Sequence, residues 1–199
     1  MAPPVILASA SRVRADMLAA AGVPFTVDTA GVDEDAVKQS LKAAGANAEE
    51  VAMSLAELKA VRVSARHTDA LVIGADQMLD CAGRWFDKPA DLAHARAHLQ
   101  ALRGKAHELI TAACVARNGS GIWRQVERAR LHMRAFSDAC LDAYLAAAGD
   151  DVLDSVGAYR IEGLGVQLFA RIEGSHFAIM GLPLLGLLAF LREHEVLTP

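Results

Sequence analysis

The sequence predicts an α/β fold in which a mixed, twisted sheet is covered by helices. Along the 199 residues, short apolar or alternating segments typical of strands are separated by segments of helical composition with recognisable caps. The turn sequence Asn118-Gly-Ser-Gly predicts a hairpin, which favours a mixed sheet over a purely parallel one. Composition is even from end to end, without repeats or linkers, so we expect a single domain over residues 1–199.

In the first half of the chain, apolar runs and alternation predict strands at 4–7, 25–28 and 71–75. Helices are expected at 12–21, which stops at a glycine, and at 47–66, which is rich in Ala, Leu, Glu and Lys. The strand at 71–75 runs into an aspartate, which we therefore place at a strand end.

In the second half, capping residues define three helices. Asp91 is a good N-cap for a helix ending at Leu102, and Ser137 is one for a helix ending near Ala148. Pro183 suits the first helical position of a final helix that reaches position 194. Strands are expected between these helices, at 109–117, 122–136 and 166–172.

Charge and hydropathy exclude several classes of protein. The net charge of −4 and the pI near 6.0 argue against general nucleic-acid binding, which needs a surplus of Lys and Arg. The mean hydropathy is +0.25, but the longest apolar stretch, 182–191, is interrupted by Pro183 and Gly186 and is shorter than the roughly 20 residues of a membrane span. We therefore expect no membrane association. The high apolar content is also compatible with a homodimer.

The cysteines and the N-terminus indicate a cytoplasmic protein. Cys81, Cys114 and Cys140 are odd in number and far apart, so neither a disulfide framework nor a zinc site is indicated. The N-terminal segment lacks the basic residues and the long apolar run of a secretion signal.

The first candidate site is the sequence Leu7-Ala-Ser-Ala-Ser, between the first strand and its helix. Small residues there let a ligand approach the backbone, Ser11 can cap the helix, and the helix N-terminus attracts anions. Ser9 and Arg14 add a hydroxyl and a guanidinium. On this segment alone, the ordinary alternative of a capped helix with surface arginines is favoured.

The second candidate is Asp76, which follows Gly74-Ala. A carboxylate at a strand end can bind Mg²⁺ or Mn²⁺ or orient a water molecule, and Asp33 and Glu34 could supply further oxygen ligands. Taken singly, each carboxylate is more often a turn or surface residue, so a metal site requires the fold to bring them together.

Lys59 and Lys88 are candidate phosphate ligands, although a lysine on an amphipathic helix is usually just solvated. Neither a Gly-x-Ser-x-Gly elbow nor a Cys–His arrangement is present to argue for covalent catalysis.

Taken in order, these segments resemble the Maf (septum formation inhibitor) family of nucleotide pyrophosphatases over nearly the whole chain, from Leu7 to about Arg192. The matching segments are Leu7-Ala-Ser-Ala-Ser, Val32-Asp-Glu, Leu58-Lys-Ala, Ile73-Gly-Ala-Asp, Asp87-Lys-Pro, Leu102-Arg-Gly-Lys-Ala-His, Val156-Gly-Ala-Tyr-Arg-Ile-Glu-Gly, Ile172-Glu-Gly-Ser and Met180-Gly-Leu-Pro-Leu. Any one of these is weak evidence, but together and in register they are strong.

The resemblance implies two lobes with a central cleft, as in Maf- and ITPase-like folds, and cleavage of a nucleoside triphosphate to a monophosphate and pyrophosphate. By position, it implies that a triphosphate is held by Ser9, Ser11, Arg14, Lys59 and Lys88. Glu34 and Asp76 would bind a divalent cation, Mg²⁺ or Mn²⁺, and Asp76 would be the general base. Arg12 and Val13 depart from the family's pattern, which leaves Arg14 as the better-matched anion ligand.

Two positions bear on the choice of nucleotide. Gln77 and Glu162 resemble the 7-methyl-GTP pyrophosphatase branch, whereas the dTTP/UTP branch carries Thr and Gln there. An ionised Glu162 could accept both donors of a guanine edge, or it could simply pair with Arg160. A dTTP/UTP pyrophosphatase and a non-catalytic nucleotide-binding regulator of septum formation are the alternatives.

Overall fold

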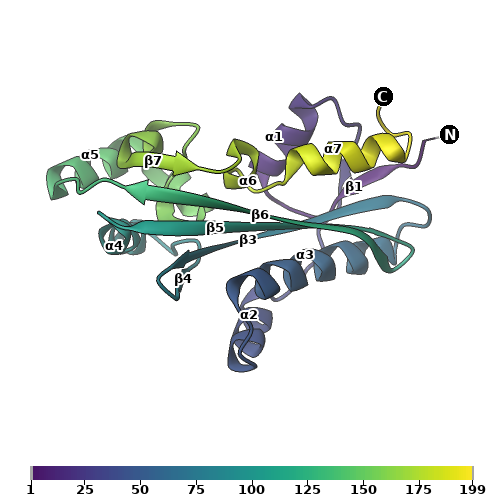
Figure 1. Ribbon diagram of the computed structural model, residues 1–199, viewed down its shortest axis with the longest axis horizontal. Helices are drawn as coiled ribbons and strands as arrows, with labels where there is room; N and C mark the ends of the chain where they lie inside the picture. Colours follow the sequence, from purple (N-terminus) through teal and green to yellow (C-terminus); the bar gives the residue numbers. More distant parts are fainter. Residues whose placement is uncertain (1, 199) are drawn as a thin grey trace. The chain divides into compact units, whose positions relative to one another are not determined.

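The computed structural model describes residues 2–198, which form a mixed α/β arrangement (Figure 1). In chain order, the elements are β1 (Val5–Leu7), α1 (Arg12–Ala20), β2 (Thr26–Val27), α2 (Glu34–Ala43), α3 (Ala48–Ser64), β3 (Leu71–Cys81), β4 (Arg84–Phe86), α4 (Leu92–Leu102), β5 (Ala106–Arg117), β6 (Ser120–Met133), α5 (Asp138–Ala148), the 3-10 helices η1 (Gly149–Asp154), η2 (Val156–Ala158) and η3 (Leu164–Leu168), β7 (Phe169–Glu173), α6 (His176–Ile179) and α7 (Leu184–Glu193).

The predicted mixed sheet is confirmed. Within residues 2–198, seven strands form it in the order β2-β1-β3-β5-β6-β7, with β4 paired to β3 outside this path. β1 pairs in parallel with both β2 and β3, whereas β3–β4 and β6–β7 are antiparallel. Antiparallel hairpins and parallel crossovers therefore coexist, as the alternation of strand and helix signals indicated.

The chain forms two compact units. Unit 1 runs to Gln77 and also contains Thr111–Glu127 and the segment from Ser175 onward. Unit 2 consists of Met78–Ile110 and Arg128–Gly174. The strands β3, β5 and β6 each contribute residues to both units.

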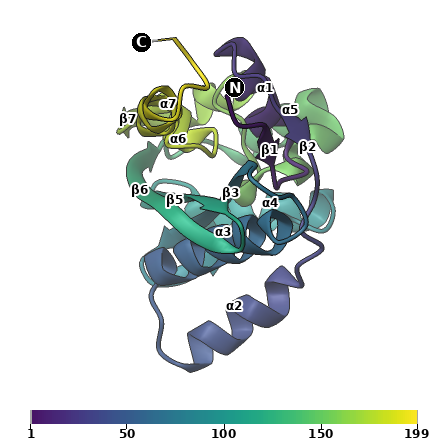
Figure 2. The ribbon, with the colours of Figure 1, turned by 90° about the vertical axis from the view of Figure 1, so that its right-hand side faces the viewer.

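Within unit 1, helices cover both faces of the sheet (Figures 1 and 2). Leu7 of β1 and Ile73 of β3 are buried with residues of α1 and α7, such as Leu18 and Leu187. The neighbouring strand residues point to the other face, as the period of two requires. There, Ile6 and Val72 are buried with Val63 of α3, together with other small and branched residues.

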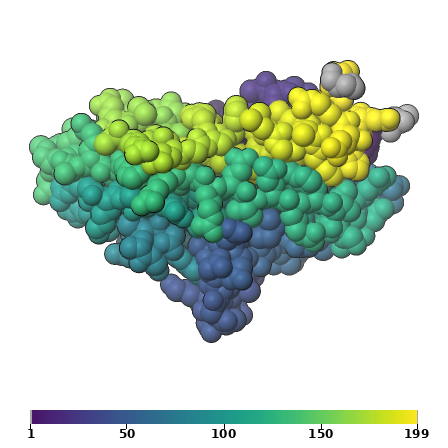
Figure 3. All heavy atoms as spheres, in the orientation of Figure 1, coloured from purple at the N-terminus to yellow at the C-terminus, as the bar shows by residue number. Residues whose placement is uncertain are grey.

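In contrast, α2 is a surface helix. None of its residues is buried, and its segment stands at the surface in the space-filling view (Figure 3). Asp33 caps the helix through a hydrogen bond from the backbone N–H of Ala36 to its Oδ1 (3.0 Å), so Glu34 is the first helical residue.

Unit 2 contains α4, α5, the 3-10 helices, β4 and β7, and it has a buried aromatic cluster. His107 Nε2 lies 2.7 Å from the Tyr159 hydroxyl, and the rings of Tyr159 and Phe169 meet edge to face at 4.8 Å. Burial raises the pKa of Tyr159 well above its ordinary value and lowers that of His107 to about 4, so both groups are neutral near pH 7.

Most predicted helices are confirmed, because local capping groups mark their starts. Ser11, Asn47, Asp91 and Ser137 each accept a hydrogen bond from a backbone N–H of the first turn, and Asn47 forms a full capping box with Glu50. In residues 2–198, no helix combines the length and the apolar character that a membrane crossing requires.

Several boundaries differ from the prediction. The strand expected to end before Asp76 continues to Cys81, so Asp76 lies in the middle of β3. The strand expected at 166–172 begins only at Phe169, because the preceding residues form η3. Pro183 is the N-cap of α7 rather than its first helical residue, and α2, β4 and α6 were not predicted.

Candidate active site

The candidate site of unit 1 lies where β1 ends. The pairing of β1 with β3 stops at Leu7 and Ile73, while β3 continues. The chain leaves β1 through α1 on one face of the sheet and reaches β3 through α3 on the other (Figure 2). In open α/β sheets, ligands bind at the carboxyl ends of strands at such a switch point.

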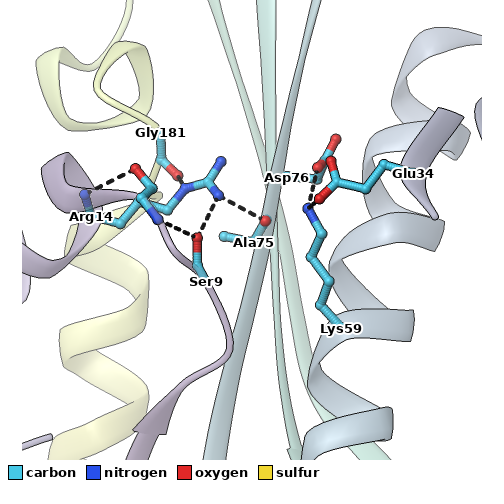
Figure 4. A network of polar contacts seen from close by, with 8 residues as sticks. Ser9, Arg14, Glu34, Lys59, Ala75, Asp76 and Gly181 are labelled. Carbon is cyan, nitrogen blue, oxygen red and sulfur yellow. Dashed lines mark hydrogen bonds and ion pairs between the residues drawn. The ribbon is translucent and has the colours of Figure 1, made fainter. Parts of the chain in front are cut away.

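Arg14 is fixed on the α1 side of this point by three hydrogen bonds (Figure 4). Its Nε donates to the carbonyl oxygen of Gly181 (2.8 Å), and its Nη1 donates to Ser9 Oγ (3.1 Å) and to the carbonyl oxygen of Ala75 (3.0 Å). Ser9 Oγ also accepts from the backbone N–H of Ser11 (3.2 Å). The guanidinium is thus held in one orientation by three segments that are distant in sequence.

The remaining nitrogen of Arg14, Nη2, has no hydrogen-bond partner among residues 2–198. Burial lowers the pKa of Arg14 from its ordinary value, and the negative charges of Asp76 and Glu34 oppose that shift. A guanidinium with two free N–H donors next to a helix N-terminus is well suited to bind a phosphate group.

On the opposite face of β3, Lys59 joins two carboxylates (Figure 4). Its Nζ donates to Asp76 Oδ1 (2.7 Å) and lies 2.8 Å from Glu34 Oε1. Lys59 and Asp76 are only 7% and 4% exposed, whereas the Glu34 side chain is 43% exposed. Asp76 Oδ2 is buried and has no hydrogen-bond partner.

A glycine brings Lys59 close enough to Asp76. A Cβ on Gly74 would lie 2.1 Å from the carbonyl oxygen of Ala56 and 2.6 Å from the backbone nitrogen of Ala60, both in α3. The backbone of α3 therefore packs directly on β3, at one residue about a turn before Lys59 and at the residue that follows it.

Gln77 lies on the same side of β3 as Arg14. Its Nε2 donates to Thr111 Oγ1 (2.8 Å) and to the carbonyl oxygens of Ala178 (2.9 Å) and Ile179 (3.1 Å). Because backbone carbonyls only accept hydrogen bonds, the amide orientation is fixed and Oε1 is left free to act as an acceptor. Thr111 was missed by sequence reasoning, since its contacts span 34 and 67 positions and leave no local signal.

The other predicted residues of unit 1 have local structural roles. Ser11 caps α1, as predicted, by accepting from the backbone N–H of Arg14 (3.4 Å). Asp33 caps α2, so its carboxylate is occupied by the backbone and does not join Lys59. The structure thus brings together Ser9 and Arg14 on one face, and Glu34, Lys59 and Asp76 on the other.

Lys88 and Glu162 belong to unit 2. Lys88 is exposed in the segment between β4 and α4. Glu162 Oε1 accepts a hydrogen bond from Arg160 Nε (2.9 Å). This is the ion pair that the sequence suggested as the alternative to recognition of a guanine base by Glu162. A second arm of the same guanidinium, Nη1, donates to Asp151 Oδ2 (3.0 Å). These three residues line a cavity of about 280 Å³, whose apolar wall includes Tyr144.

The donor set fits a weakly held divalent cation better than a dedicated metal centre. Within residues 2–198, no group of three or more His, Cys, Asp or Glu side chains is arranged to hold a metal ion. However, Mg²⁺ is commonly bound by one or two carboxylates together with water and substrate phosphates. Asp76, with its unpartnered Oδ2, and Glu34 provide such a pair.

The fold and the site define an α/β protein with an anion-binding arginine and a carboxylate–lysine cluster on the two faces of one strand. The sequence model of the Maf family, described as Maf-like protein, matches residues 4–194. The chain belongs to this family.

Its full-length relatives carry related names. A protein of Paramagnetospirillum magneticum named nucleoside triphosphate pyrophosphatase is 59% identical over 98% of this chain and 100% of its own length. One of the same name from Granulibacter bethesdensis is 55% identical, with 98% of each chain covered. A protein of Rhizobium meliloti named 7-methyl-GTP pyrophosphatase is 47% identical, with 97% of each covered.

Proposed function

We propose that the chain is a nucleoside triphosphate pyrophosphatase, an enzyme that hydrolyses the bond between the α and β phosphates and releases a monophosphate and pyrophosphate. Family membership and the names of the full-length relatives support this activity. The observation that carries it is the buried Asp76, which keeps one oxygen free while Lys59 holds the other.

In this proposal, Arg14 and Ser9 bind the triphosphate. The two free N–H donors of Arg14 Nη2 and the first turn of α1 face the anion, and the hydrogen bonds to Gly181, Ala75 and Ser9 prevent the guanidinium from turning away. Phosphoryl chemistry depends mainly on such positioning and charge stabilisation.

Asp76 acts as the general base. A carboxylate oxygen of Asp76 accepts a proton from water as the water oxygen forms a bond to phosphorus, and the bridging P–O bond breaks so that the leaving phosphate group takes the electron pair. Before the cation and the nucleotide bind, Lys59 and Glu34 hold Asp76 in place. No covalent enzyme intermediate is required.

The charges at the site favour a divalent cofactor. Arg14 and Lys59 are positive and Asp76 and Glu34 are negative, so the formal charges cancel, and the whole protein carries −4. A triphosphate anion would therefore gain little net attraction. Mg²⁺ or Mn²⁺ held by Asp76 and Glu34 would supply the missing positive charge and neutralise the phosphates.

The remaining residues that the family's motifs indicate as ligands belong to unit 2. We assign Lys88 to the phosphates and Glu162 to the base, with Arg160 orienting the Glu162 carboxylate through its hydrogen bond. Residues 1–199 would act as one catalytic domain, since long strands are shared by both units. Gln77 presents an acceptor, and so does Glu162, which favours a base edge rich in N–H donors, as in guanine or 7-methylguanine.

A substrate comparison tests the choice of nucleotide. Pyrophosphate release from 7-methyl-GTP, GTP, UTP and dTTP should be measured with Mg²⁺ or Mn²⁺ under identical conditions. We expect the guanine-type nucleotides to have the higher kcat/KM. A preference for UTP and dTTP would identify the pyrimidine branch instead, and an absence of turnover with all four would favour a binding protein.

The activity itself is tested by Asp76→Asn, with Asp33→Asn as the matched control. Asparagine keeps the shape of Asp76 but cannot take a proton, so kcat should fall by about 10²–10⁴-fold while the circular dichroism spectrum is unchanged. Asp33 is adjacent to Glu34 but only caps α2, a task that asparagine performs equally well, so its variant should keep its activity. Equal turnover by Asp76→Asn and wild type would show that Asp76 is not the base.

A further inference from the structure

Lys59 differs from an ordinary helix lysine because its ammonium is buried. It belongs to the buried face of α3, together with Leu55, Ala56, Ala60 and Val63. Lysine on an amphipathic helix normally extends its charged end into water. Here, Nζ instead reaches Asp76 Oδ1 at 2.7 Å and Glu34 Oε1 at 2.8 Å.

This arrangement is required by charge. A buried ammonium is costly unless it is paired, and the two carboxylates provide that pairing. Conversely, Asp76 and Glu34 can approach the same point only because a positive charge lies between them. Without it, Asp76 would be a buried carboxylate facing a second one.

We propose that Lys59 is a positioning residue whose ammonium holds Asp76 and Glu34 together and competes with the divalent cation for the space between them. This inference rests on the metal dependence in the proposed function. A cation ligated at about 2.0–2.1 Å by the same carboxylates cannot share that space with an ammonium. The carboxylate pair therefore stays assembled without metal, at the cost of weaker metal binding.

The free oxygen of Asp76 gives the exchange a starting point. Asp76 Oδ2 is buried and has no hydrogen-bond partner, so it is the oxygen of Asp76 that a cation could take as a ligand while Lys59 still holds Oδ1. To gain Glu34 as a second ligand, the cation has to take the place of the ammonium. The released ammonium then needs new acceptors, which nucleotide phosphates supply. Lys59 therefore first holds the two carboxylates together and afterwards binds phosphate.

The test is a titration of nucleotide-free protein with Mn²⁺, in which electron paramagnetic resonance measures the concentration of the free ion. Lys59→Met removes the charge while keeping an unbranched apolar chain. Because it leaves two carboxylates without a counter-charge, we expect it to bind Mn²⁺ at least about tenfold more tightly than wild type. Lys42→Met, which removes one positive charge from an exposed position of α2, should bind as wild type does.

Unchanged or weaker Mn²⁺ binding by Lys59→Met would overturn the proposal, as would an absence of binding by both proteins. If Lys59→Met does not fold, Lys59→Gln is compared with the wild-type protein instead. In nitrogen-15 NMR of the lysine ammonium groups, the Lys59 signal should shift or vanish saturably with Mg²⁺, and a signal insensitive to Mg²⁺ would refute the exchange. Both readouts are made without turnover, so a failure of nucleotide hydrolysis is distinguished from a failure of this inference.

Discussion

Gly74→Ala tests whether the packing of α3 on β3 determines the active site. The added Cβ would lie 2.1 Å from the carbonyl oxygen of Ala56 and 2.6 Å from the backbone nitrogen of Ala60. Both neighbours are backbone atoms of a regular helix, so they cannot turn aside as a side chain would. The helix as a whole has to move, and Lys59 lies between these two residues.

The magnitude follows from that geometry. Restoring ordinary contact requires α3 to shift by more than about 1 Å, and overpacking of this kind costs typically 1–3 kcal/mol in the free energy of unfolding. Because the clash is with backbone, we expect about 3 kcal/mol, which corresponds to a fall in Tm of roughly 6–12 °C for a chain of this size. A displacement near 1 Å at Lys59 should also reduce kcat/KM by about 10²-fold.

Urea denaturation and a pyrophosphate-release assay measure the two effects. Gly163→Ala is the control, since its Cβ would meet nothing nearer than 4.0 Å, and it should lose far less stability. Adding Ala60→Gly to Gly74→Ala should not restore stability, because it removes only a Cβ contact and leaves the backbone clash. A Gly74→Ala protein with the stability and activity of wild type would refute the packing argument.

Three further predictions concern buried or fixed polar groups. Burial, aided by the charge of His132, lowers the pKa of folded His107 to about 4, whereas unfolded His107 binds a proton below about pH 6.5. The free energy of unfolding should therefore fall by up to about 1.4 kcal/mol per pH unit as the pH is lowered from about 6.5 towards 4. His107→Gln should lose less stability over this range when urea denaturation is repeated at each pH. Arg14→Lys cannot make all three fixed hydrogen bonds, so its affinity for a non-hydrolysable triphosphate should fall by about tenfold or more, and unchanged calorimetric affinity would contradict this. Gln77→Glu would place an oxygen against two carbonyl oxygens and should cost about 1–3 kcal/mol of stability in urea, more than Gln77→Met.

Local chemistry explains why much of the fold was predictable. Ser11, Asn47, Asp91 and Ser137 accept hydrogen bonds from backbone N–H groups of the second or third residue of each helix, so the signal and the structure lie in the same short segment. The turn at Asn118 is equally local, and its backbone has the positive φ of 50° expected for a tight hairpin.

The interior of β3 was not predictable in this way. Asp76 and Gln77 are polar and looked like the end of a strand, yet the side chains of both form hydrogen bonds inside it. Asp76 is paired by Lys59, 17 positions away, and Gln77 by carbonyl groups about 100 positions away. Tertiary contacts therefore override the local preference, and no local pattern reports them. For the same reason, the sequence analysis predicted that Lys59 binds phosphate but did not predict its ion pairs with Asp76 and Glu34.

Three consecutive residues of β3 connect the two faces of the site. The carbonyl oxygen of Ala75 fixes Arg14, the side chain of Asp76 pairs with Lys59 on the α3 face, and the side chain of Gln77 is held by the carbonyl groups of the last two residues of α6. Because alternate side chains of a strand point to opposite faces, a single rigid segment can orient an anion ligand and a base at once. A change in the course of β3 would therefore disturb phosphate binding and proton transfer together, whereas the hydroxyl of Ser9 can be lost with Asp76 still in place.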